Sequence, residues 1–112
     1  MTHHDETKRI AELNDICRAA MGVAGRLVLT AGIASLPSAD QSAIIEKVQN
    51  FKDFSADNDP YGERDFGAFE HAGEKIFWKI DYYDPTLSQG SDDPADPKKT
   101  ARVLTILLAE EY

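Results

Sequence analysis

Carboxylates are the residues of this chain whose number and placement could do chemistry, and they are concentrated in its second half. Residues 53–112 contain fourteen Asp and Glu and six Lys and Arg, whereas residues 1–52 contain six of each class. The formal net charge of −8 therefore belongs to residues 53–112. A field of this sign repels phosphate, so the composition argues against direct binding of nucleic acid or of an anionic membrane and favours a basic protein partner.

A calcium loop is the first specific chemistry to test, over residues 57–62. Asp57 and Asp59 occupy the first and third positions of such a loop, and Gly62 occupies the sixth. The pattern fails at the twelfth position, which requires a bidentate Glu and holds Ala68. The segment instead predicts a solvated type I turn, with Asp59 first and Gly62 last.

Nucleophile and zinc chemistry are equally poorly supported, so we predict no catalytic residue, no metal site and no cofactor. His3 and His4 are expected in a frayed terminus, and His71 is expected in a hairpin loop. Cys17 lies in the middle of a predicted helix, where a reactive thiol is not expected and core packing is. With this single cysteine, and without an apolar signal segment, the chain is expected to be cytoplasmic.

The first predicted element is an amphipathic helix over about residues 5–21. Its apolar residues recur at spacings of three and four, which places them on one stripe that faces the core. Asp15 and Arg18 are expected on the opposite, solvated side. A strand over residues 26–30 follows. The stripe expected to be buried consists of Ile10, Leu13, Ile16, Cys17 and Ala20.

A second helix is expected over about residues 39–51. Ser38, followed three residues later by Gln41, forms a capping-box pattern. Asp40 lies in the first turn, where the helix dipole favours an anion. The apolar stripe of this helix consists of Ile44, Ile45, Val48 and Phe51.

A β-hairpin is predicted next, with strands over residues 64–70 and 75–83 and a four-residue loop between them. Its register is chosen because one alignment satisfies three favourable cross-strand pairs at once. Those pairs are Glu70 with Lys75, Arg64 with Asp81, and Gly67 with Trp78.

The last predicted strand, over residues 102–109, is apolar on both faces and is therefore expected at the centre of the sheet. A long acidic loop, residues 84–99, precedes it, and loops of that length in compact domains are usually functional or mobile. The order of elements predicts a single α+β domain over residues 1–112. We expect two helices packed on one face of a mostly antiparallel four-stranded sheet.

Several blocks of the sequence resemble a family of short bacterial proteins known only as a domain of unknown function. They are NDPYGERDFG (58–67), FWKIDYYD (77–84), DPADP (93–97) and RVLTI (102–106), and the similarity extends to residues 10–14 and 25–36. The resemblance implies no activity, substrate or cofactor, but members are often encoded on plasmids and other mobile elements. By analogy with small acidic proteins in that setting, it suggests an inhibitor of a host defence protein that acts as a nucleic-acid mimic.

The leading functional hypothesis is an acidic, non-enzymatic protein-interaction module that masks a basic, nucleic-acid-binding surface of a partner. The outer face of the hairpin combines aromatic residues with oriented charges, a composition typical of interfaces. Cover of Phe77 and Tyr83 by residues 84–99 or by the C-terminus is an equally open alternative. The predicted partner-binding residues are Asp57, Asp59, Tyr61, Glu63, Arg64, Asp65, Phe77, Lys79, Asp81, Tyr83, Asp84, Asp92, Asp93 and Asp96.

A small enzyme or ligand-binding domain is the competing hypothesis. Its site would use Asp59, Tyr61, Arg64 and Asp65 in a cleft beside the predicted turn at residues 59–62. A deep pocket with buried carboxylates would favour this hypothesis, because burial shifts carboxyl pKa values into a useful range. A third possibility is a homodimer that forms through the hairpin.

Overall fold

The computed structural model describes residues 3–112, with side chains from Asp5 onward. In chain order the elements are α1 (His3–Ala19), β1 (Arg26–Leu29), α2 (Ala31–Ala34), α3 (Ser38–Gln49), β2 (Phe66–His71), β3 (Glu74–Tyr83), β4 (Ala101–Leu108) and a 3₁₀ turn, η1 (Ala109–Glu111). The side chains of His3 and His4 lie outside the described part, so their expected role stays a prediction.

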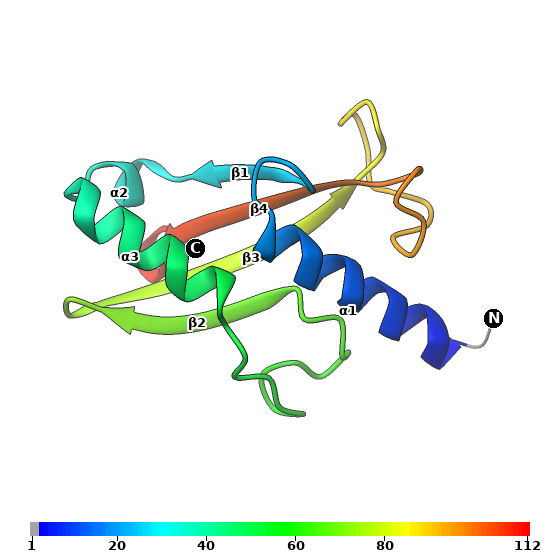
Figure 1. The fold of residues 1–112 in the computed structure, drawn as a ribbon, viewed down its shortest axis with the longest axis horizontal. Coiled ribbons are helices and arrows are strands. Elements are labelled where there is room, and N and C mark those ends of the chain that lie inside the picture. Colours follow the sequence, from blue (N-terminus) through cyan, green and yellow to red (C-terminus); the bar gives the residue numbers. More distant parts are fainter. Residues whose placement is uncertain (1–2) are drawn as a thin grey trace.

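A four-stranded sheet with the order β1-β4-β3-β2 is the centre of this α+β fold (Figure 1). β4 has neighbours on both sides, as its apolar sequence predicts. The sheet is mixed rather than mostly antiparallel, because β1 lies parallel to β4 whereas β3 is antiparallel to both β4 and β2. A parallel pair needs a long connection, and residues 30–100 provide it with two helices and a hairpin.

The buried face of α1 differs from the predicted stripe. Ile10 and Cys17 are buried as expected, but Ile16 is 51% exposed. Asn14 and Arg18 are buried instead, at 0% and 4% exposure. The helical pattern placed Arg18 in solvent and did not assign Asn14 to either side. Both side chains are buried because the core offers them hydrogen-bond partners.

The start of α3 also differs from the prediction. Ser38 is the first residue of the helix rather than its cap, and Pro37 occupies the N-cap position without a side-chain hydrogen bond. The amide of Gln41 instead donates to the carbonyl oxygens of Ala34 and Leu36. Gln41 therefore ties α3 to the end of α2, a short helix that the sequence did not predict.

The hairpin has the predicted register over most of its length. Gly67 pairs with Trp78 and Glu70 with Lys75. The turn is tighter than expected, because it consists of Ala72 and Gly73 alone, at φ values of 52° and 81°. Two consecutive positive φ angles are typical of a type I′ turn, which suits the twist of a hairpin.

The expected pair between Arg64 and Asp81 does not form, because β2 begins only at Phe66. Arg64 bonds to Asp15 of α1, and Asp81 bonds to Lys79 of its own strand at 2.9 Å. Arg64, which we predicted to pair within the sheet, therefore connects the start of the hairpin to α1.

The core joins the helices to alternate residues of the two central strands. Trp78 is fully buried and contributes to one cluster with Cys17 of α1, Val48 of α3 and Ile106 of β4. The rings of Phe51 and Phe54 lie edge-on to the indole, at centroid distances of 5.5 and 6.1 Å. Trp78 therefore anchors the segment between α3 and β2, residues 50–65, which carries most of the candidate site.

Candidate functional site

The turn at residues 59–62 forms as predicted and is reinforced by its own side chain. The backbone N–H of Gly62 donates to the carbonyl oxygen of Asp59 at 3.0 Å. The carboxylate of Asp59 also accepts a hydrogen bond from the backbone N–H of Arg64 at 3.1 Å. These bonds fix the turn against the open end of the β2–β3 hairpin.

A cavity of about 420 Å³ lies between this turn, the outer face of the hairpin and the C-terminal residue. We call it the acidic cavity, because three carboxylates and one cation line it. Its volume falls within the range of about 300–1,000 Å³ that is usual for ligand sites. Five of the predicted site residues line it, namely Asp59, Tyr61, Asp65, Lys79 and Asp81.

The charges of the acidic cavity perturb one another. Burial raises the pKa of Asp65, and the nearby carboxylates of Glu63, Asp59 and Asp81 raise it further against a backbone hydrogen bond that lowers it. The pKa of Lys79 is raised mainly by its hydrogen bond to Asp81. Asp81 is therefore already paired, whereas Asp65 is a half-buried carboxylate among others of the same sign.

Aromatic rings complete the wall of the acidic cavity. Phe66 and Tyr112 line it directly, and their ring centroids lie 6.1 Å apart in an edge-on arrangement. Phe77 contacts both rings, at 5.2 Å from Phe66 and 5.5 Å from Tyr112. The C-terminus thus covers part of Phe77, as one of the alternatives in the sequence analysis expected. Tyr83 lies farther along β3, paired with Ala101.

Tyr112 is the wall residue that sequence reasoning missed. The 3₁₀ turn η1 places it, and the carboxylate of Glu111 holds that turn against the start of α2. Glu111 accepts hydrogen bonds from Thr30 Oγ1 at 2.6 Å, from Leu108 N at 2.9 Å and from Gly32 N at 3.0 Å. No local pattern predicts the contacts with Thr30 and Gly32, because each joins residues about eighty positions apart.

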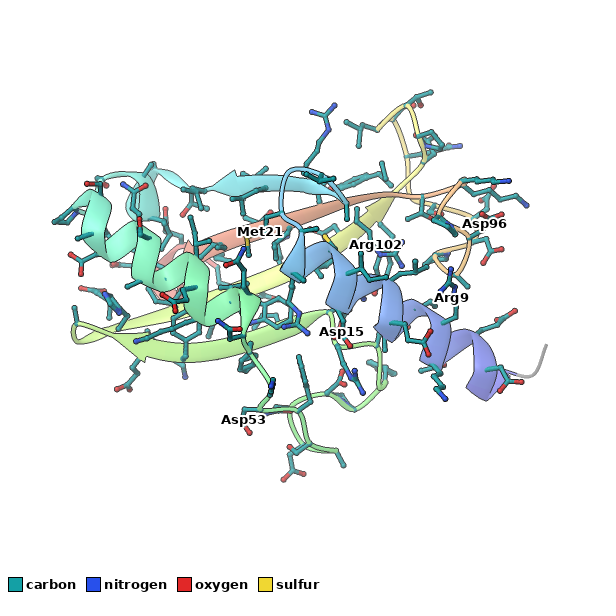
Figure 2. All side chains as sticks on the ribbon, viewed as in Figure 1. Arg9, Asp15, Met21, Asp53, Asp96 and Arg102 are labelled. Atoms are coloured by element: carbon teal, nitrogen blue, oxygen red, sulfur yellow. The ribbon has the colours of Figure 1, made fainter. Side chains whose placement is uncertain are left out.

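Four of the remaining predicted acids, Asp84, Asp92, Asp93 and Asp96, lie in residues 84–100, the loop between β3 and β4, apart from residues 50–65 (Figure 1). Asp84 accepts hydrogen bonds from Thr86 and Ser88, which lower its pKa. The carboxylates of Asp93 and Asp96 accept backbone hydrogen bonds from Ala95 and Lys98. Figure 2 shows Asp96 in this loop on the same side of the molecule as Arg9 and Arg102.

The loop acids therefore fix local turns, and the structure does not bring them into the acidic cavity. Asp92 is exposed in the same loop. Asp57 is exposed in residues 50–65 without lining the cavity. Arg64 does not line the acidic cavity and bonds to Asp15 of α1 instead.

A buried polar network beneath the site was not predicted. The guanidinium of Arg102 donates to Asn14 Oδ1 at 2.7 Å and to the carbonyl oxygen of Pro94 at 2.6 Å. The amide of Asn14 donates to the hydroxyl of Tyr82 at 2.8 Å, and this hydroxyl donates to Glu63 at 2.8 Å. The network links α1 to β3, β4 and both long loops, so it positions Glu63 as a structural residue.

The arrangement at the acidic cavity suits binding of a cation more than covalent chemistry. Among the described residues, no group of three or more His, Cys, Asp or Glu side chains is arranged to hold a metal ion. Burial raises the pKa of the Cys17 thiol, and Cys17 is only 1% exposed.

None of the helices in the described part of the chain has the length and apolar character of a membrane span.

Comparison with known proteins gives one match. The family described as "Protein of unknown function (DUF3768)" matches residues 29–111. The chain belongs to this family. The match includes the acidic cavity except for Tyr112 and begins after α1, so the resemblance expected at residues 10–14 is not part of it. Searches of curated proteins and of solved structures found no match.

Proposed function

We propose that the chain is a non-enzymatic interaction module that captures a basic segment of a partner protein in the acidic cavity. The observation that carries this proposal is the set of side chains that line the cavity. Asp59, Asp65 and Asp81 supply carboxylates, and Tyr61 and Tyr112 supply aromatic rings. Carboxylates bind guanidinium and ammonium groups through charge-assisted hydrogen bonds, and aromatic faces attract the same cations.

The exposure of the turn supports a protein partner. Tyr61 is 81% exposed and Tyr112 is 76% exposed, so two large rings project at the rim of the cavity. Tyrosine is one of the residue types that dominate binding energy at interfaces, so exposed tyrosine rings beside charged groups are consistent with a protein-binding surface. Capture of a basic surface that normally binds nucleic acid would inhibit the partner, in agreement with the expectation from the sequence.

The proposal is tested by measuring, by calorimetry at low ionic strength, the affinity of the chain for two arginine-containing peptides of equal charge, one flexible and one helical. We expect the double variant Asp59→Asn/Asp65→Asn to weaken binding by about tenfold or more, because each charge-assisted hydrogen bond contributes on the order of 1.5–3 kcal/mol. The matched control is Asp92→Asn/Asp96→Asn, which removes the same charge from the distant loop. Equal weakening by both double variants would show that only net charge matters and would contradict a site at the turn.

The competing function is a small-ligand domain or enzyme at the same turn, and the observation that favours it is that the cavity has the size of a ligand site. Agmatine, which presents a guanidinium without a peptide, distinguishes the two. If agmatine binds as tightly as the peptides, the cavity is a small-molecule site. If it binds at least about tenfold more weakly, the peptide backbone and the exposed rings contribute and the interaction module is supported.

A further inference from the structure

A second cavity, of about 520 Å³, lies where α1, the end of α3 and residues 50–65 meet. We call it the cationic cavity. Arg18, Lys52 and Arg64 line it against a single carboxylate, that of Asp15. Its formal charge is therefore opposite in sign to that of the whole chain, and no residue of the acidic cavity contributes to it.

Arg18 forms the floor of the cationic cavity and is held in place by several contacts. Its Nη1 donates to the carbonyl oxygens of Val48 and Phe51, at the end of α3, and its Nη2 donates to Asp15. The guanidinium lies 5.0 Å from the centre of the Trp78 ring. Its Nε is buried without a hydrogen-bond partner among the described residues, which leaves one donor of this charged group unused.

Arg64 and Lys52 supply the cations that a ligand can reach. The Arg64 side chain is 45% exposed, and a single carboxylate, that of Asp15, is shared between Arg64 and Arg18. Arg64 also has a φ of 55°, a conformation that costs free energy in a residue with a side chain and that persists at functional sites. Lys52 is exposed and has no partner among the described residues.

Apolar rings stand beside these cations. Phe51 and Phe54 both line the cavity, and their centroids lie 5.1 Å apart. Figure 2 shows Asp15 on the side of α1 that meets residues 50–65, the segment that contains Asp53. Cations and an apolar wall in a cavity of this size are the features of a site for a small organic anion.

We propose that the cationic cavity binds the oxyanion group of a small organic ligand, a phosphate monoester or a carboxylate, through Arg64 and Lys52. The apolar body of the ligand packs against Phe51 and Phe54. No residue lines both this site and the acidic cavity, so the two proposed sites use different side chains.

Trp78, the only tryptophan, gives a reporter that does not itself touch the ligand. We would titrate the ¹⁵N-labelled protein with phenyl phosphate, benzoate and uncharged phenol at constant ionic strength and follow the single indole N–H resonance. Saturable shifts with either anion and none with phenol are expected. The relative affinities of phenyl phosphate and benzoate identify the oxyanion. Shifts that follow added chloride equally well, or no saturable shift with either anion, would overturn the proposal.

The variant Lys52→Gln tests the site without disturbing the fold, because Lys52 is exposed and unpaired among the described residues. We expect it to weaken binding of the preferred anion by about tenfold, the loss of one charge-assisted hydrogen bond. The control, Lys98→Gln, removes an exposed lysine from the distant acidic loop and should leave the affinity unchanged. Equal affinities for the wild type and Lys52→Gln would contradict the assignment, whatever the outcome for the acidic cavity.

Discussion

The two cavities beside residues 50–65 differ in how the protein supports their charges. In the acidic cavity, Asp59, Asp65 and Asp81 are partly exposed, and one lysine, Lys79, is paired with Asp81. In the cationic cavity, Arg18 is 4% exposed and is bonded to carbonyl oxygens at the end of a helix. One site is built on loop and strand surface, and the other is built on the core.

This difference shows that net charge is a poor guide to local chemistry. A buried arginine requires partners that offset its desolvation, and the C-terminal carbonyl groups of α3 provide them together with Asp15. Partly exposed carboxylates need no such partners, because water screens their repulsion. We therefore expect substitutions under the cationic cavity to affect stability strongly, and substitutions in the acidic cavity to affect it weakly.

The largest effect is expected from Gly67→Ala, which acts on the aromatic layer beneath the cationic cavity. A Cβ at this position would overlap the indole of Trp78 and the ring of Phe51. Displacing these rings overpacks the core, so the variant should lose about 3 kcal/mol of unfolding free energy. Chemical denaturation measures this loss. Gly90→Ala is the control, because its Cβ would have its nearest neighbour at 3.9 Å, and it should be close to neutral. Equal stability of the two variants would show that Gly67 is not needed for close approach.

A smaller effect is expected from Asp15→Asn, which removes the one carboxylate of the cationic cavity. Asp15 bonds both Arg18 and Arg64, so its loss should cost about 1–2 kcal/mol of stability. The same change leaves Arg64 free for a ligand and should tighten binding of the preferred phenyl anion severalfold. Denaturation and the indole titration measure the two effects. Binding that weakens in step with stability would mean that Asp15 only holds the fold.

Much of the fold was predictable because its signals are local. The alternation of Ile76, Trp78 and Ile80 in β3 and the cross-strand pair of Gly67 with Trp78 gave the register of the hairpin. The turn at residues 59–62 followed from its residue types. Each of these features depends on neighbours in the chain or on one pairing across a tight turn.

The parallel pairing of β1 with β4 depends on the path of the seventy-one residues between them, so no local pattern shows it. The burial of Asn14 and Arg18 was missed because periodicity treats polar residues as solvated. Their partners, Tyr82 and the end of α3, become neighbours only in the folded chain.

The acidic cavity was predicted in part, since its carboxylates are visible in the sequence. The cationic cavity was not predicted, because Arg18 comes from α1 whereas Lys52 and Arg64 lie twelve residues apart in residues 50–65, and only the fold brings them together.

The smallest effect is expected in the acidic cavity itself, from the pH dependence of Asp65→Asn. Burial and neighbouring carboxylates raise the pKa of Asp65 above 3.8 in the folded state, so the folded protein binds this proton more tightly than the unfolded chain does. Stability contributed by this group therefore falls as pH rises through the range just above 3.8, and it recovers as pH falls.

Asn cannot ionise, so the variant should gain less than about 1 kcal/mol at pH 7, since the group is partly exposed and its charge is screened. The gain should vanish toward pH 3, where both proteins carry a neutral side chain. Denaturation curves at pH 3 and pH 7 measure this difference. A variant less stable than the wild type at pH 7 would mean that the Asp65 carboxylate is stabilised by its surroundings, and the acidic cavity would then resemble the cationic one in being supported by partners of opposite charge.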